Sequence, residues 1–124
     1  MDLFAETNLV FKVGRYGKTN ERLLAPRKIY SADTGIRSFF TGFRDKGSLF
    51  ENYVYLRLRK YHPEYVYQNG IEIDFLLERK SLMEVKFHQE ELSLKQKFLM
   101  DSFPAGEKVV IRNAKDLEVW LAGR

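Results

Sequence analysis

The chain has 124 residues and a net charge of +4, and its 44% hydrophobic and 15% aromatic content is typical of a folded domain. The absence of cysteine excludes a disulfide framework and a zinc–thiolate site. No apolar run approaches the roughly 20 residues that span a bilayer, and the first residues lack the pattern of a secretion signal, so we expect a cytoplasmic protein with no membrane partner.

The positive charge is concentrated in one early segment. Between positions 12 and 28 there is one acidic residue, Glu21, and six basic residues: Lys12, Arg15, Lys18, Arg22, Arg27 and Lys28. A concentrated basic segment attracts a phosphate backbone, so we predict that these six residues bind nucleic acid. A solvated, flexible arm would explain the same charge equally well.

The first part of the chain is predicted to be a basic hairpin followed by a helix. The expected elements are the end of a helix at 2–8, a strand at 9–13, a turn-rich stretch at 14–20, a returning segment from 23, a strand at 28–31 and a helix at 36–43. Asp33 or Thr34 is a plausible N-cap for that last helix.

The clearest helical pattern runs from residue 49 to residue 61. Ser48 and Glu51 match the S-x-x-E capping box, which predicts the helix start. His62-Pro63 should end the helix, because proline disfavours a helical conformation in the residue before it. Glu51 therefore has a structural explanation as a capping residue, beside any role at a functional site.

The remaining elements predict an α/β (α+β) fold. They are strands at 65–68, 71–77 and 82–87, a helix at 89–102, and strands at 108–112 and 117–121. From residue 47 the predicted order is α-β-β-β-α-β-β, with a central mixed sheet flanked by helices. Lys95, Gln96 and Lys97 either reach substrate phosphates or form an exposed helix face, and the second interpretation is favoured.

The strands at 71–77 and 82–87 are predicted to form a hairpin with a charged face. Alternate side chains point to one face of a strand, so Glu84 and Lys86 lie together. A three-residue loop at 79–81 would put Asp74 directly opposite Lys86, with Glu84 its diagonal neighbour roughly 7 Å away. The same register would unite the apolar side chains in one core: Ile73, Phe75, Met83, Val85 and Phe87.

Two carboxylates and a lysine at this spacing predict a site for Mg²⁺ or Mn²⁺. Such hard cations prefer carboxylate oxygens supplemented by water. Asp74 and Glu84 would bind the metal, and Lys86 would orient the attacking water and contact the phosphate. The alternative is an exposed ion pair, worth about 0 to 1 kcal/mol.

Asp74 followed by Glu84-Val85-Lys86 resembles the PD-(D/E)XK motif of restriction-endonuclease-like proteins, with Ile73 where the motif prefers proline. The wider pattern is similar to the uncharacterised domain that follows the ATPase module in prokaryotic AAA-type ATPases. Four segments carry this resemblance: Lys28-Ile-Tyr-Ser-Ala-Asp-Thr-Gly35, Gly47-Ser-Leu-Phe-Glu-Asn52, Gly70-Ile-Glu-Ile-Asp-Phe75 and Met83-Glu-Val-Lys86. They occur in the family's order, and the resemblance covers nearly the whole chain.

The resemblance implies a restriction-endonuclease-like core at 31–124, preceded at 1–30 by the end of a winged-helix-like unit with the basic hairpin as its wing. It also implies catalytic roles for Glu51, Asp74, Glu84 and Lys86, and an ATPase module upstream in a longer protein. Two functions stay open. One is a metal-dependent nuclease acting on DNA, or alternatively RNA. The other is a module that holds nucleic acid or a partner for the ATPase without cutting.

Overall fold

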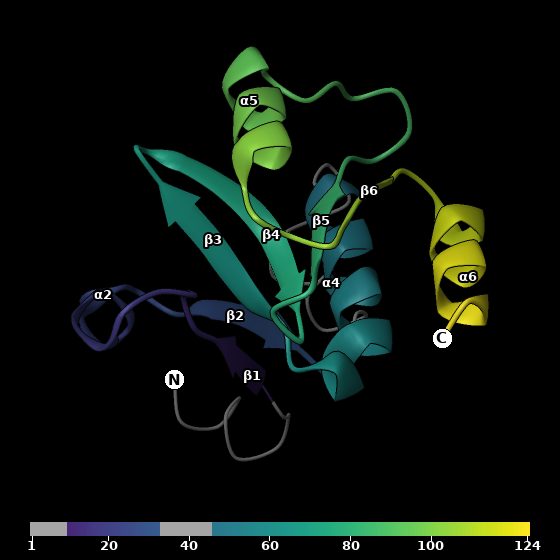
Figure 1. Cartoon of the computed structure of the whole chain (residues 1–124). Coiled ribbons are helices and arrows are strands. Elements are labelled where there is room, and N and C mark those ends of the chain that lie inside the picture. The colour runs from purple at the N-terminus through teal and green to yellow at the C-terminus, as the bar shows by residue number, and fades with distance from the viewer. Residues whose placement is uncertain (1–9, 33–45) are drawn as a thin grey trace.

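The computed structural model describes residues 10–32 and 46–124, and Figure 1 shows a twisted sheet with helices around it. The elements are β1 (Val10–Val13), α2 (Thr19–Leu24), β2 (Lys28–Ser31), α4 (Lys46–Leu58), the 3₁₀ turn η1 (Arg59–Tyr61), β3 (Glu64–Gln68), β4 (Ile71–Leu77), β5 (Ser81–Val85), α5 (Leu94–Ser102), β6 (Glu107–Ile111) and α6 (Ala114–Ala122). The helices predicted at 2–8 and 36–43, with the Asp-Thr-Gly turn between them, lie outside these residues. Within the two described ranges, every helix is too short or too polar to cross a membrane.

Four strands form the central sheet in the order β3-β4-β5-β6. The first three are consecutive and antiparallel, whereas β6 runs parallel to β5 after a crossover through α5. A separate antiparallel pair, β1 and β2, lies beside this sheet (Figure 1). The fold is therefore mixed α/β, with a mixed four-stranded sheet flanked by helices, as predicted.

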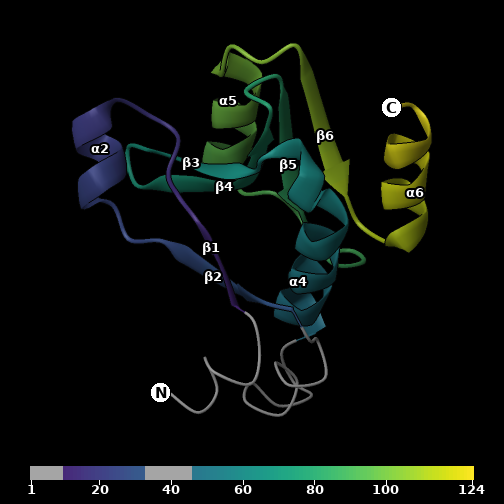
Figure 2. The same cartoon turned by 90° about the horizontal axis from the view of Figure 1, so that it is seen from below.

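Two hydrophobic clusters cover opposite sides of the central sheet. One side packs against α4, β1, β2 and α6, through residues that include Val54, Leu58, Phe75, Met83 and Leu117. The other packs against α5, through Ile73, Leu82, Leu99 and Phe103 among others. Figure 2 shows α5 and α4 on opposite sides of the sheet, in agreement with these two clusters.

The first described segment is packed against the rest of the domain. Val13 and Tyr30 belong to the same core as α4. The Tyr16 backbone N–H donates to the Tyr65 carbonyl at 2.8 Å, which connects the segment after β1 to β3. The boundary predicted near residue 30 stays a prediction, but β1 and β2 contribute directly to the hydrophobic core.

One helix was not predicted, and two predicted helices begin at other residues than expected. The stretch from residue 19 is helical, because the Glu21 carboxylate accepts from the Lys18 N–H at 3.2 Å and supports a helix start there. Helix α4 begins at Lys46, two residues before Ser48, so the predicted capping box is wrong. Helix α5 begins only at Leu94, since Ser93 and Gln96 form its capping box.

The last element is a helix, so the strand predicted at 117–121 is wrong. The Asn113 side chain accepts from the Asp116 N–H at 2.9 Å and caps α6. Leu117 and Trp120 are buried while Val119 is 66% exposed, which follows the period of a helix and not the alternation of a strand. The observed order from α4 is therefore α-β-β-β-α-β-α.

The two turns that frame β4 set the position of the functional residues. Asn69 and Gly70 both have positive φ, at 54° and 78°, and form a tight two-residue turn from β3. At the other end the loop is 78–80, one residue earlier than predicted, and Leu77 pairs with Ser81. Glu78 and Arg79 both adopt left-handed conformations there, at φ 51° and 56°, and neither residue type signals such a turn in a sequence.

A β-bulge in β4 changes which side chains share a face. Glu64 pairs with Leu76 and Val66 pairs with Ile73, so one residue of β3 opposes two of β4, Asp74 and Phe75. Ile73 therefore packs on the α5 side, whereas Phe75 packs on the α4 side. The predicted single core containing both residues is wrong, because the extra residue interrupts the alternation at Asp74.

Candidate functional site

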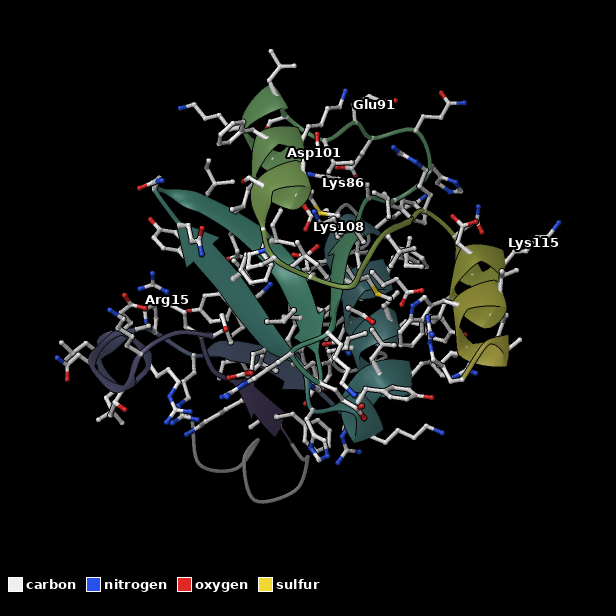
Figure 3. The ribbon with its side chains drawn as sticks, viewed as in Figure 1. Arg15, Lys86, Glu91, Asp101, Lys108 and Lys115 are labelled. Atoms are coloured by element: carbon white, nitrogen blue, oxygen red, sulfur yellow. The ribbon has the colours of Figure 1, made fainter. Side chains whose placement is uncertain are left out.

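One surface pocket brings together the four residues predicted as catalytic: Glu51, Asp74, Glu84 and Lys86 all line it. They come from α4, β4, β5 and the residue that follows β5. Helix α5 contributes Lys95 and Gln96 to the same pocket. In Figure 3, Lys86 lies on the α5 side of the sheet, close to that helix.

Asp74 and Glu84 are connected across the end of the hairpin. The ladder between β4 and β5 stops at the pair Phe75–Met83. Beyond it, the Asp74 N–H donates to Glu84 Oε1 at 2.9 Å, and the Val85 N–H donates to Asp74 Oδ2 at 2.9 Å. Asp74 therefore lies next to Glu84 and not directly opposite Lys86, which corrects the predicted register by two residues.

Lys86 lies next to the outer oxygen of Glu84. Its Nζ is 3.6 Å from Glu84 Oε2, and its backbone N–H donates to the Ile111 carbonyl of β6 at 3.0 Å. The parallel strand β6 thus fixes the chain at Lys86 while the side chain reaches the carboxylate. Glu84 and Lys86 lie together, as predicted.

Lys28 is the main constituent that the sequence reasoning did not assign to this site. Its Nζ lies 3.0 Å from Glu51 Oε2, 3.0 Å from Glu72 Oε2 and 3.3 Å from Asp74 Oδ1. We predicted Lys28 as part of the basic arm, whereas the structure places it among three carboxylates. The sequence contained one signal for this inward position. Residues 28 and 30 of a strand point to the same face, and Tyr30 is buried.

The contacts between α4 and β2 hold Glu51 in place. Asn52 is fully buried, and its side chain accepts from the Ser31 N–H and donates to the Ser31 carbonyl, both at 2.9 Å. One residue earlier on α4, Glu51 Oε2 accepts a hydrogen bond from the Tyr30 hydroxyl at 2.5 Å. Glu51 is therefore part of the site through β2, which its predicted capping role did not suggest.

We predicted that Gln96 belongs to an exposed helix face, but its side chain points into the site. Its Nε2 donates to Glu84 Oε2 at 2.8 Å, while its Oε1 accepts from the Ser93 N–H in the capping box of α5. The start of α5 thereby orients the carboxylate of Glu84 from outside the sheet.

Burial and like charge favour the protonated forms of the paired acids. Burial, followed by the neighbouring Asp74, raises the pKa of Glu84 to about 9. Burial, followed by Glu51, also raises the pKa of Asp74, although Lys28 opposes this shift. For Lys28, burial disfavours the ammonium, but the carboxylates of Asp74 and Glu51 outweigh it and raise the pKa of the lysine above its ordinary range.

We expect the metal-free protein to lose stability as the pH rises. The Glu84 pKa is 4.5 ordinarily and about 9 in the folded protein, so the folded state keeps a proton that the unfolded state releases between these values. The free energy of unfolding should therefore fall over that window, by at most about 1.4 kcal/mol per pH unit for one proton. Urea unfolding in EDTA at pH 6 to 9 measures this slope.

Glu84→Gln removes the titrating group and should flatten that slope. Glu118→Gln is the matched control, because Glu118 is an exposed glutamate of α6 and its ion pair with Arg57 lies at the surface. An unchanged slope in Glu84→Gln would mean that another group carries the pH dependence.

The donor set suits a hard divalent cation, although a lysine stands in the way. Carboxylate oxygens of Glu51, Glu72 and Asp74 already surround one cation, the Lys28 ammonium, at 3.0 to 3.3 Å. Over residues 10–32 and 46–124, no three acidic or histidine side chains are arranged to hold a metal ion as they stand. The residue types therefore suit a hard cation, whereas their arrangement in this structure pairs three of the carboxylates with the Lys28 ammonium.

The other basic residues of the early segment lie away from this cluster. Four of the six predicted nucleic-acid-binding residues are exposed: Lys12, Lys18, Arg22 and Arg27. Arg15 is half-buried and donates through Nη2 to the Tyr67 carbonyl at 2.6 Å, at the side of the molecule where α2 lies (Figure 3). None of these five residues lines the acidic pocket, and Arg15 and Lys18 line a different hollow.

Comparisons of the chain with protein-family models, with curated proteins and with solved structures give no match.

Proposed function

We propose that this chain is a metal-dependent nuclease-like domain acting on DNA phosphodiesters, and that it forms the C-terminal part of a longer ATPase. The observation that carries the proposal is the convergence of Glu51, Asp74, Glu84 and Lys86 on one pocket. These residues come from α4, β4 and the end of β5, and two of them, Asp74 and Glu84, are buried acids with raised pKa. Strongly perturbed groups that meet in a cleft are characteristic of functional sites.

Each residue has a role that its surroundings support. A divalent cation, when bound, supplies Lewis-acid stabilisation of a phosphate oxygen and makes a water molecule more acidic. Asp74 and Glu84 hold that cation, and Glu51 assists from α4. Lys86, 3.6 Å from Glu84, orients the attacking water and contacts the phosphate.

The substrate class follows from the charge distribution around the pocket. The pocket is acidic, while Lys12, Lys18, Arg22 and Arg27 are exposed on and around β1 and α2. A DNA strand bound by this basic surface is held by its phosphates without reading base sequence. Lys95 at the pocket rim provides a further cation near the cleaved bond.

The test is cleavage of supercoiled, linear and single-stranded DNA by the purified protein. We expect nicking or degradation with Mg²⁺ or Mn²⁺, none in EDTA, and co-elution of the activity with the protein in gel filtration. An RNA substrate run in parallel separates the two nucleic acids. Absence of cleavage on every substrate with either metal would reject the nuclease.

A non-catalytic module is the second candidate, and one observation favours it. Lys28 already neutralises part of the acidic cluster, so the site is stable without a metal. Such a domain holds nucleic acid or a partner for the attached ATPase. DNA binding that is equally tight in EDTA and in Mg²⁺, with no cleavage, is the result that distinguishes this module from the nuclease.

A further inference from the structure

The ammonium of Lys28 lies among three carboxylates that line the pocket. Three carboxylate oxygens lie within 3.3 Å of Nζ, from Glu51, Glu72 and Asp74. Below it are aromatic rings, with centroids 5.6 Å away for Tyr30 and 5.8 Å away for Phe75. Ring faces and carboxylates both attract cations, so this is a built cation position and Lys28 fills it.

Two of the three carboxylates that hold Lys28 are also proposed as part of the metal site, namely Glu51 and Asp74. Four of the acids that line the pocket pair with two ammonium groups: Glu51, Glu72 and Asp74 with that of Lys28, and Glu84 with that of Lys86. An ammonium and a divalent cation cannot occupy the same point among the same oxygens, because they repel each other. Binding of one therefore requires displacement of the other.

We propose that Lys28 is a tethered cation that fills the metal position in the metal-free protein and must swing out before a divalent cation binds. This inference rests on the proposed metal site. Glu72 provides the route, because its side chain is 43% exposed and is the outermost of the three carboxylates. Lys28 can keep this partner while its four-carbon stem turns toward solvent. The lysine then lowers the metal affinity without contributing to the chemistry.

Lys28→Met should increase the affinity for Mn²⁺, measured by isothermal titration calorimetry at pH 7.5 without DNA. Methionine keeps an unbranched apolar stem over the rings and removes the competing charge. A neighbouring unit charge changes the preference of a carboxylate for a cation by one to three powers of ten, so we expect tighter binding on the order of 10- to 100-fold. Lys115→Met, at an exposed lysine of α6, should bind like the wild type, and Lys28→Arg should not bind more tightly.

The outcomes separate this inference from the proposed function. Equal Mn²⁺ affinity in Lys28→Met and wild type would overturn the role of Lys28 and leave the metal site intact. No Mn²⁺ binding by either protein would overturn the metal site and the inference together. Tighter binding by Lys28→Met without DNA cleavage would support the role of Lys28 and reject only the nuclease.

A measurement on the wild type decides the question if Lys28→Met does not fold. In a uniformly ¹⁵N-labelled sample, the Nζ signal of Lys28 should shift as Mg²⁺ is added, in parallel with the backbone amides of Asp74 and Val85. Those amides report on the carboxylates because they take part in the Asp74–Glu84 hydrogen bonds. Amide shifts with an unchanged Lys28 signal would overturn the inference.

Discussion

Asp74→Asn and Lys86→Met should each reduce metal-dependent cleavage by about 100-fold or more and leave the protein folded. Asparagine preserves the shape of Asp74 and can still accept from the Val85 N–H, but it removes the charge that the metal needs. Methionine preserves the stem of Lys86 and removes the ammonium that lies 3.6 Å from Glu84. The measurement is the initial rate of plasmid nicking in Mn²⁺, with circular dichroism to verify folding.

Matched variants outside the pocket control for the change of charge. Asp101 and Lys115 are exposed, on α5 and α6, and neither of them lines the acidic pocket; Figure 3 shows Lys115 on the outer side of α6. Asp101→Asn and Lys115→Met should cleave at the wild-type rate. Cleavage that survives in both Asp74→Asn and Lys86→Met points to a contaminant or to a different site.

Strands with a continuous apolar pattern were predictable from the sequence. The bounds predicted for β2 and β4, at 28–31 and 71–77, agree with the structure. Strand β3 differs by one residue from its prediction. In these segments local propensity and burial favour the same conformation, so no tertiary information is needed.

Helix α6 shows where strand propensity misleads. Its sequence Leu117-Glu-Val-Trp-Leu121 alternates apolar and polar residues for three positions and contains residues that favour strands. Packing of Leu117 and Trp120 against the core outweighs that preference. The cap formed by Asn113 and Asp116 was the signal for a helix, because an asparagine three residues before an aspartate predicts a start there.

The residues of the site were predictable, but their register was not. Residue types and strand alternation suffice to bring Asp74, Glu84 and Lys86 to one region. The bulge at Asp74 and Phe75 depends on how β3 pairs with β4, and the 78–80 loop depends on two residues in left-handed conformations. Neither feature has a signature in a single sequence.

Lys28 shows the limit of counting charge along a chain. Six basic residues in one segment predicted a common role, yet β2 turns Lys28 inward beside the buried Tyr30. A lysine on the buried face of a strand needs a carboxylate partner, because an unpaired buried charge is costly. Only the fold identifies Glu51, Glu72 and Asp74 as those partners, since they come from two other elements.

Phe75→Ala should lower the free energy of unfolding by about 3 to 5 kcal/mol, a large part of the roughly 5 to 15 kcal/mol available to a typical domain. Phe75 is 0% exposed, and its ring centroid lies 5.8 Å from that of Tyr30 and 6.2 Å from that of Tyr55. Alanine leaves a cavity at the contact between β4, β2 and α4. Urea unfolding monitored by the fluorescence of Trp120 measures the loss.

Phe98→Ala is the control that separates burial from residue type. Phe98 lies on α5 and is 71% exposed, so its removal should change the free energy of unfolding by less than about 0.5 kcal/mol.

Phe75→Ala also removes one of the rings next to Lys28, whose Nζ is 5.8 Å from the Phe75 centroid. Truncation of a buried phenylalanine to alanine typically costs about 3 to 5 kcal/mol. A loss below about 1 kcal/mol for Phe75→Ala would therefore contradict the packing of β2 and α4 around this ring. It would also contradict the contact between the Phe75 ring and the Lys28 ammonium.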